Sequence, residues 1–95
     1  MNIVFIEGKI ISDIKFHFII NSNNISIATF EIELLNKSIV QIKAYNELAD
    51  YCYSKLNKND VVFIEGYLNS NMEIIIKTLK KTRIKKKKTE NKTKK

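Results

Sequence analysis

The sequence of 95 residues has no proline, no tryptophan, two glycines and one cysteine. The single cysteine, Cys52, excludes an intramolecular disulfide and a zinc site built from cysteines, and its place in a helical pattern is typical of a small core residue. No apolar run has the length of a bilayer-spanning helix, and the N-terminus lacks the charged start and the cleavage site of a signal peptide. We therefore expect one small domain that is soluble and not secreted.

Positive charge gathers at the C-terminal end of the chain, whose formal net charge is +7. Residues 1–76 contain six Lys and nine Asp or Glu, which gives −3, whereas residues 77–95 contain eleven Lys or Arg and one Glu, which gives +10. A basic end attracts polyanions by neutralising phosphates and releasing counterions. The alternative is that the lysine run aids solubility or reflects a biased composition.

Apolar and polar residues alternate with a period of two in four segments of the first half, which is typical of half-buried strands. We predict these strands over residues 2–12, 14–20, 25–34 and 38–45. Residues 21–24, of sequence NSNN, have the composition of a turn, and Asn36-Lys37 makes a second, shorter one.

The parity of the strands predicts which aromatic side chains face the core. Phe16 and Phe18 share one parity, and we expect both to face the core, with His17 facing solvent on the other side. Phe5 and Phe63 point outward if their apolar neighbours point inward, and exposed phenylalanine is costly. We therefore expect the face that carries Phe5 and Phe63 to be covered.

The period changes to that of a helix over residues 46–56. Its apolar positions are Leu48, Ala49, Cys52 and Leu56. Asn46 is the predicted N-cap, and Glu47 suits the positive end of the helix.

After a turn at residues 57–60, alternation predicts two more strands, over residues 61–68 and 72–79. Ile84 is the last apolar residue, so we expect residues 1–84 to form the folded domain and residues 85–95 to be a flexible, Lys-rich tail. Four strands, one helix and two strands can close a small, partly open Greek-key barrel. The predicted fold class is therefore all-β with one short helix, an OB fold of five to six strands.

The pentapeptide VFIEG occurs at residues 4–8 and again at residues 62–66, and its copies end on Gly8 and Gly66, which are the two glycines of the chain. The spacing fits no solenoid or propeller repeat, so the copies are the first strand and the first strand after the helix. Glycine inside a strand marks a bulge, a sharp bend or a close backbone approach, which predicts barrel corners at Gly8 and Gly66. Chance identity of two β-rich strings is the alternative for the recurrence itself.

Four pieces of the chain are similar, in the same order, to motifs of one known family. They are NIVFIEGKI at residues 2–10, Asp13, YNELADYCYSKLNKN at residues 45–59 and VVFIEGYL at residues 61–68. In these pieces the chain resembles the bacterial-type single-stranded DNA-binding protein, over residues 2–84. The resemblance implies an OB fold, base stacking on aromatic side chains in a basic groove, and a homodimer or higher homo-oligomer formed through the first strand.

The chain departs from that family at positions that bind bases. Ile39 stands where the resemblance places a tryptophan, and residues 69–70 stand where it places an arginine. The loops after Leu34 and Leu68 are very short, and a basic end replaces an acidic tip, so we expect no partner recruitment through such a tip. Asn59 replaces the helix-ending glycine and tolerates the left-handed conformation.

The candidate site has two parts. In the body, the resemblance carries over Tyr45 as the stacking aromatic and Lys9 as a basic residue, and Lys37 and Lys43 are further candidate phosphate contacts. The alternatives are a strand-end aromatic that covers the barrel and ordinary solvated lysines. The basic C-terminal part comprises Lys77, Lys80, Lys81, Arg83, Lys85, Lys86, Lys87 and Lys88.

We expect non-catalytic binding of single-stranded nucleic acid, DNA rather than RNA, with little sequence preference, without a metal or cofactor and without a membrane partner. Neither a Gly-rich phosphate loop nor a nucleophile motif occurs in the sequence. One alternative is a protein-interaction OB module of a replication or nucleoid assembly, as in the family's primosomal relative, with non-specific polyanion binding by the basic tail. Association with RNA or the ribosome through the tail is the other.

The composition bears on the source of the chain. Ile, Lys and Asn make up 44 of its 95 residues, and their codons are rich in A and T. With the short length, this bias favours a plastid-encoded open reading frame of an alga, in the chloroplast; the alternative is the cytoplasm of an A/T-rich bacterium.

Overall fold

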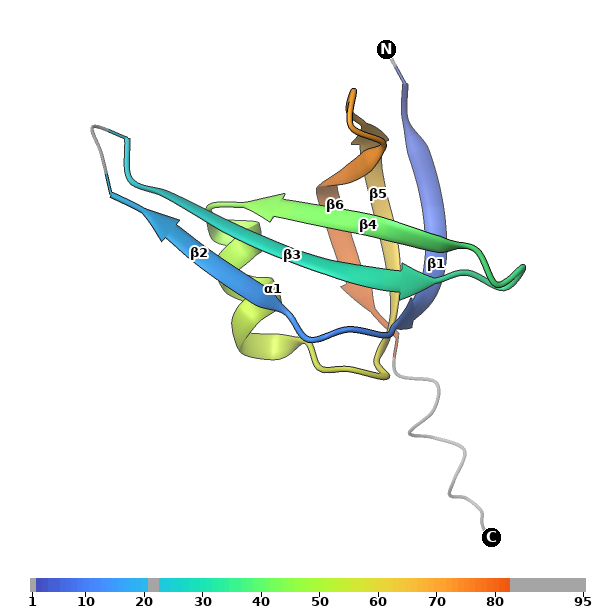
Figure 1. Ribbon diagram of the computed structural model, residues 1–95. Helices are drawn as coiled ribbons and strands as arrows, with labels where there is room; N and C mark the ends of the chain where they lie inside the picture. Colours follow the sequence, from blue (N-terminus) through green and yellow to red (C-terminus); the bar gives the residue numbers. More distant parts are fainter. Residues whose placement is uncertain (1, 21–22, 83–95) are drawn as a thin grey trace, which may run out of the picture.

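The computed structural model describes residues 2–20 and 23–82. This part of the chain contains six β-strands and one α-helix (Figure 1). In chain order they are β1 (Val4–Ile10), β2 (Lys15–Ile19), β3 (Ile25–Glu33), β4 (Ile39–Tyr45), α1 (Glu47–Lys55), β5 (Val61–Leu68) and β6 (Glu73–Lys81). Every predicted element is present, and the predicted ends differ from these bounds by at most two residues. Periodicity was therefore sufficient to identify the elements.

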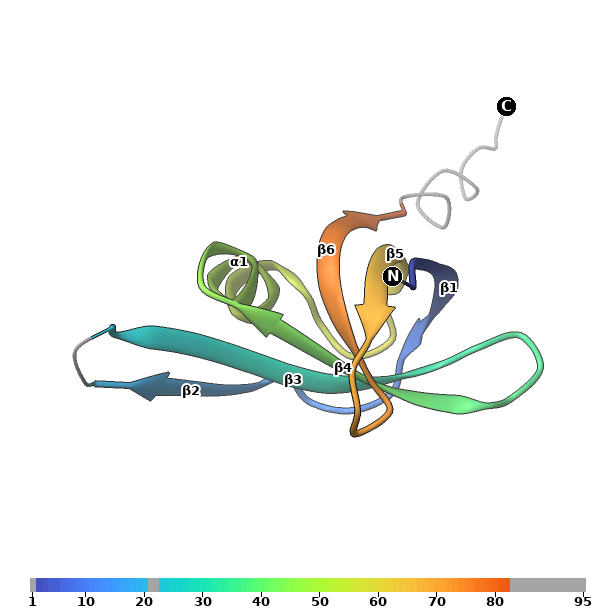
Figure 2. The same cartoon turned by 90° about the horizontal axis from the view of Figure 1, so that it is seen from above.

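Five of the strands close a barrel, and the sixth extends it. The order in the sheet is β1-β5-β6-β4-β3-β2, and an additional pairing of β1 with β3 closes the ring. That closure has only two residue pairs, Lys9 with Glu33 and Ile10 with Ile32. Within the described chain, β2 pairs only with β3, so the β2–β3 hairpin projects from the barrel (Figure 2). This arrangement confirms the predicted OB fold.

The two VFIEG segments are paired with each other. β1 and β5 are antiparallel, with Ile6 opposite Ile64, so that each valine lies opposite the glycine of the other copy and each phenylalanine lies opposite a glutamate. The pair is therefore symmetric about Ile6 and Ile64. The recurrence has a structural consequence: the same side chains face the core from both strands, and Phe5 and Phe63 both point outward.

Space, and not backbone conformation, requires glycine at both positions, because neither Gly8 nor Gly66 has a positive φ. A Cβ on Gly8 would lie 2.6 Å from the carbonyl oxygen of Glu33, where β1 meets β3. A Cβ on Gly66 would overlap the carbonyl oxygen of Ile75. At that point the β5–β6 register moves from Glu65–Thr78 to Gly66–Ile76, a β-bulge. The prediction that the glycines mark barrel corners agrees with both close approaches.

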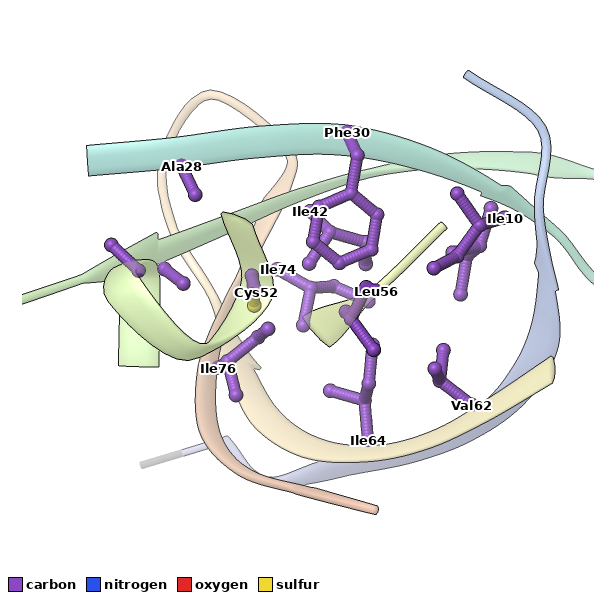
Figure 3. Close-up of a cluster of buried hydrophobic side chains, with 13 residues drawn as sticks. Ile10, Ala28, Phe30, Ile42, Cys52, Leu56, Val62, Ile64, Ile74 and Ile76 are labelled. Carbon is purple, nitrogen blue, oxygen red and sulfur yellow. The ribbon is translucent and has the colours of Figure 1, made fainter. Parts of the chain in front are cut away.

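Side chains from five strands and α1 fill the barrel (Figure 3). Phe30 and Ile42 of the β3–β4 layer point toward Val62 and Ile64 of β5 (Figure 3). The helix contributes its buried face, which is Ala49, Cys52 and the following Leu56. Burying each large aliphatic side chain contributes about 1.5–3 kcal/mol, so this cluster is the main source of stability.

The prediction for Phe18 is wrong, and Asn46 is at the predicted N-cap position but does not cap the helix with its side chain. Phe18 is 55% exposed, because β2 runs past the end of the barrel, whereas Phe16 packs on the core and stacks on Tyr53 of α1 at 4.8 Å. Asn46 precedes the helix, but its side chain makes no capping hydrogen bond; its backbone turns with a φ of 56°. The left-handed conformation expected of Asn59 is present, with a φ of 79°.

Gly66→Ala should destabilise the barrel by at least about 2 kcal/mol, because the new methyl group meets backbone and cannot be accommodated by a rotamer change. This cost exceeds the gain of about 0.4–1 kcal/mol from stiffening the unfolded chain. Urea unfolding followed by circular dichroism measures the difference, with Ser70→Ala in the exposed β5–β6 turn as the matched control. A Gly66→Ala variant as stable as the wild type would show that the bulge tolerates a side chain.

Candidate nucleic-acid interface

Most of one side of the β2–β3–β4 layer is left uncovered by the rest of the described chain. In Figure 2, α1 and most of β1, β5 and β6 lie on the other side of this layer, whereas the turn between β5 and β6 and the connection from β1 to β2 pass along this side. The even-numbered residues of β3 are buried, whereas its odd-numbered residues are half-buried. We call the surface formed by the odd-numbered residues of β2, β3 and β4 the outer face.

Strand register arranges part of the outer face in two neighbouring rows, which we call the basic–aromatic rows. They are His17–Ile27–Tyr45 and Lys15–Thr29–Lys43. Because neighbouring strands lie about 4.8 Å apart, each row spans roughly 10 Å across the layer. Tyr45 is 37% exposed at the end of β4, and the two rows also hold an aliphatic residue and three basic residues.

The next row along the strands, Glu31–Gln41–Glu73, is acidic. The Gln41 amide donates a hydrogen bond of 2.6 Å to Oε2 of Glu31. Glu33 lies one row further, opposite Ile39. The outer face is thus divided into a basic, aromatic half next to the hairpin and an acidic half next to β1.

Lys43 lies on the boundary between these halves. Its Nζ is 3.6 Å from Oε1 of Glu73, and both side chains are about one quarter exposed. The same Oε1 accepts a hydrogen bond of 2.9 Å from the amide of Asn69. A pair this accessible contributes at most about 1 kcal/mol, so an incoming phosphate can replace Glu73 as the partner of Lys43.

Lys9 and Lys37 are not next to Tyr45. Lys37 follows β3 in the turn before β4, and six residues of β4 separate that end from Tyr45, about 20 Å by the rise of a strand. Lys9 and Lys37 instead lie together at an open hollow of roughly 860 Å³ beside β1. Its lining comprises Phe5, Ile6, Glu7, Gly8, Lys9, Glu33, Leu34, Leu35, Asn36, Lys37 and Val61. The predicted body site is therefore two separate places, one with Lys43 and Tyr45 and one with Lys9 and Lys37.

The basic residues of β6 differ in their surroundings. Lys77 and Lys80 are exposed, and Lys77 lies two residues beyond Ile75, the partner of Lys43. Lys81 is half-buried and is 3.3 Å from a carboxylate oxygen of Asp60. The remaining predicted residues of the basic part lie outside the described residues; they are Arg83, Lys85, Lys86, Lys87 and Lys88.

Sequence reasoning missed the residues that β2 and β3 bring beside Tyr45. Lys15 lies at the start of β2, and His17 was correctly predicted to face solvent but was given no role. The alternation of these strands contained the signal for their outward direction. Their place next to Lys43 and Tyr45, however, depends on the registers of two strand pairs, which the sequence does not reveal.

The opposite side of the barrel carries an apolar surface. Phe5 and Phe63 point outward as predicted, are 62% and 42% exposed, and have ring centroids 6.4 Å apart. Ile3 and Tyr67 are also exposed. We call Ile3, Phe5, Phe63 and Tyr67 the apolar face; Glu65 lies opposite Phe5, and Glu7 lies opposite Phe63.

Nothing in the described part of the chain is arranged for metal or thiol chemistry. Residues 2–20 and 23–82 contain no group of three or more His, Cys, Asp or Glu placed to hold a metal ion. Burial raises the pKa of the Cys52 thiol to about 12, so at neutral pH it lacks the thiolate that a nucleophile needs. Among these residues, too, no helix has the length and apolar character to cross a membrane.

Comparison with known proteins identifies the fold. No protein-family model matches the sequence, and no curated protein matches it either. The SSB domain of a Synechococcus protein is similar in structure, with a TM-score of 0.73 and 17% identity over 83% of this chain and 93% of that one. The single-stranded DNA-binding protein from Thermus aquaticus has a TM-score of 0.76 and 17% identity; the match covers 87% of this chain and 41% of that one.

A mitochondrial single-stranded DNA-binding protein from S. cerevisiae has a TM-score of 0.72 and 17% identity over 86% of this chain and 94% of that one. The chain spans about two fifths of the Thermus protein, but nearly the whole of the other two. The chain therefore shares the OB fold of these three structures.

Proposed function

We propose that this chain binds single-stranded nucleic acid, DNA in the first place, without catalysis and with little sequence preference. The observation that carries the proposal is the exposed Tyr45 ring on an uncovered OB face, with Lys15, Lys43 and His17 in the same two rows. An aromatic ring accepts any base by stacking, and lysines neutralise phosphates whatever the sequence. The similar structures from Thermus aquaticus and S. cerevisiae are single-stranded DNA-binding proteins, which supports the proposal.

The mechanism combines one stacked base with local phosphate contacts. A base on Tyr45 contributes about 1–3 kcal/mol, and Lys43 exchanges Glu73 for a phosphate. The acidic row of Glu31 and Glu73 repels the strand, which therefore crosses the layer along the basic–aromatic rows. Residues 77–95, with a net charge of +10, add electrostatic attraction. With one stacking ring and an acidic row, binding by the body is weak.

A chain shortened to residues 1–84 tests whether the barrel itself binds. We expect it to prefer oligo-dT over a duplex of equal length, with lower affinity than the full chain and a shallower dependence on salt, because fewer phosphates are neutralised. Fluorescence anisotropy across a salt series measures both quantities. Binding that disappears with the tail, or that is equal for single strand and duplex, would contradict the proposal.

Tyr45→Ala should lower the affinity for oligo-dT at least about fivefold, or roughly 1 kcal/mol, because a stacking platform is lost. Tyr51→Ala is the matched control, since Tyr51 of α1 is 39% exposed, close to the 37% of Tyr45. Both variants are compared by the same anisotropy titration after their urea midpoints have been measured. Equal affinities of the two variants would remove Tyr45 from the site.

We also propose that the chain self-associates through β1. Within the described chain, residues Val4–Gly8 pair with β5 on one side only, which leaves a strand edge open beside the hollow at Lys9 and Lys37. The adjoining apolar face carries the stacked rings of Phe5 and Phe63. Exposed apolar surface of this kind is typical of an interface. The same face favours the second candidate function, a protein-interaction module, if its partner is a different protein.

Sizing with light scattering at tens of micromolar should give a mass of at least twice the 11.1 kDa of one chain. Phe5→Glu should lower that mass toward the monomer, because it removes an exposed aromatic ring and adds a carboxylate opposite Glu65. A wild-type chain that is monomeric under these conditions would exclude self-association and favour a different partner protein.

A further inference from the structure

His17 faces solvent and lies in one of the basic–aromatic rows, but the sequence alone indicates no function for it. It is the one histidine of the chain, and the β2–β3 and β3–β4 registers place it in one row with Ile27 and Tyr45. Lys15 precedes it by two residues on the same face of β2, and Lys15 in turn shares a row with Lys43. The backbone positions of His17 and Tyr45 are thus about two strand spacings, roughly 10 Å, apart.

We propose that His17 is a phosphate contact whose protonation strengthens binding of single strands, so that the β2–β3 hairpin makes the interface sensitive to pH. The inference rests on the proposed function and extends its site from β4 onto β2. Histidine gains its positive charge between about pH 5 and 8. A strand that stacks a base on Tyr45 and continues along this row passes over Ile27 to His17, where only the protonated imidazole neutralises phosphate.

The surroundings of His17 support this role. On its own strand the charged neighbour is Lys15, and β3 presents the uncharged side chains of Ile25, Ile27 and Thr29 next to it. From β4 the row is completed by Tyr45, with Lys43 in the neighbouring row. Of the carboxylates near the outer face, Glu31 and Glu73 belong to the acidic row on the far side of Lys43. Asp13, two residues before Lys15, lines a small pocket with Lys15, Thr29 and Glu31. No carboxylate is therefore in either basic–aromatic row, where it would pair with the imidazolium in place of a phosphate.

The helix lies against the other face of the hairpin. Tyr53 of α1 stacks on Phe16, whose side chain points away from the outer face. The charged residues of α1 are Glu47, Asp50 and Lys55. Glu47 is the closest of them in sequence to the row of His17, because it follows Tyr45 by two residues. Acidification that removes negative charge from carboxylates would also favour the binding of a single strand. The experiment therefore has to separate His17 from the carboxylates.

The experiment uses the full chain with oligo-dT at pH 5.5 and at pH 8.0, at equal ionic strength, in three versions: wild type, His17→Gln and His17→Lys. We expect the wild type to bind about three- to fivefold more tightly at pH 5.5, as for one added exposed ionic contact. His17→Gln and His17→Lys should both lose most of this ratio, and at pH 8.0 His17→Lys should bind more tightly than the wild type. Effects of the carboxylates are common to the three proteins and cancel in the comparison.

The salt dependence gives a second readout. At pH 5.5 the slope of log affinity against log salt should be smaller for His17→Gln than for the wild type by about 0.7, the value for one phosphate contact on a single strand. The inference is wrong if His17→Gln keeps the pH ratio of the wild type. The proposed function nevertheless stands in that case if single strands are still preferred and Tyr45→Ala still weakens binding. If single strand and duplex bind equally and Tyr45→Ala has no effect, the proposed function and this inference are both overturned.

Discussion

The close packing of β1 between β5 and β3 is the constraint on which the outer face depends. β1 reaches β3 through only two residue pairs, and it does so next to Gly8, where no Cβ separates it from the carbonyl oxygen of Glu33. On the other side, β1 and β5 are held by the symmetric pairing of the two VFIEG segments. Closing the ring in this way fixes the position of β3, and the registers of β3 with β2 and β4 then set every row of the outer face.

The division of charge on that face decides how a single strand can lie on it. The acidic row Glu31–Gln41–Glu73 crosses the layer between Lys43 and the hollow with Lys9 and Lys37. A strand that followed β4 along its length would have to pass this row, whereas one that crosses from β4 to β2 meets Lys43, Lys15 and His17. The two lysine groups of the body therefore do not form one continuous track, although in sequence they looked equivalent.

An OB barrel and the surface used for binding make different demands on the sequence. The barrel needs inward apolar residues at alternate positions and glycine where backbones approach closely. Many sequences meet these demands. For this reason the similar structures have TM-scores above 0.7 although only 17% of their residues are identical to those of this chain. Binding depends on outward residues that the barrel leaves free to vary. Ile39 is an example: it is exposed on the outer face where the resemblance places a tryptophan, and the fold is unaffected.

Alternation and helical spacing by themselves determined the seven elements, the inward face of β1 and β5, and the outward direction of Phe5, Phe63 and His17. These are local properties, because the period of a segment and the position of a glycine need no knowledge of its neighbours. The tertiary structure decided that Phe18 lies beyond the core, that Lys9 and Lys37 are far from Tyr45, and that Lys15 and His17 are beside it. Each of these depends on which strands pair and in what register, and a shift of one residue would have turned the same side chains to the other face.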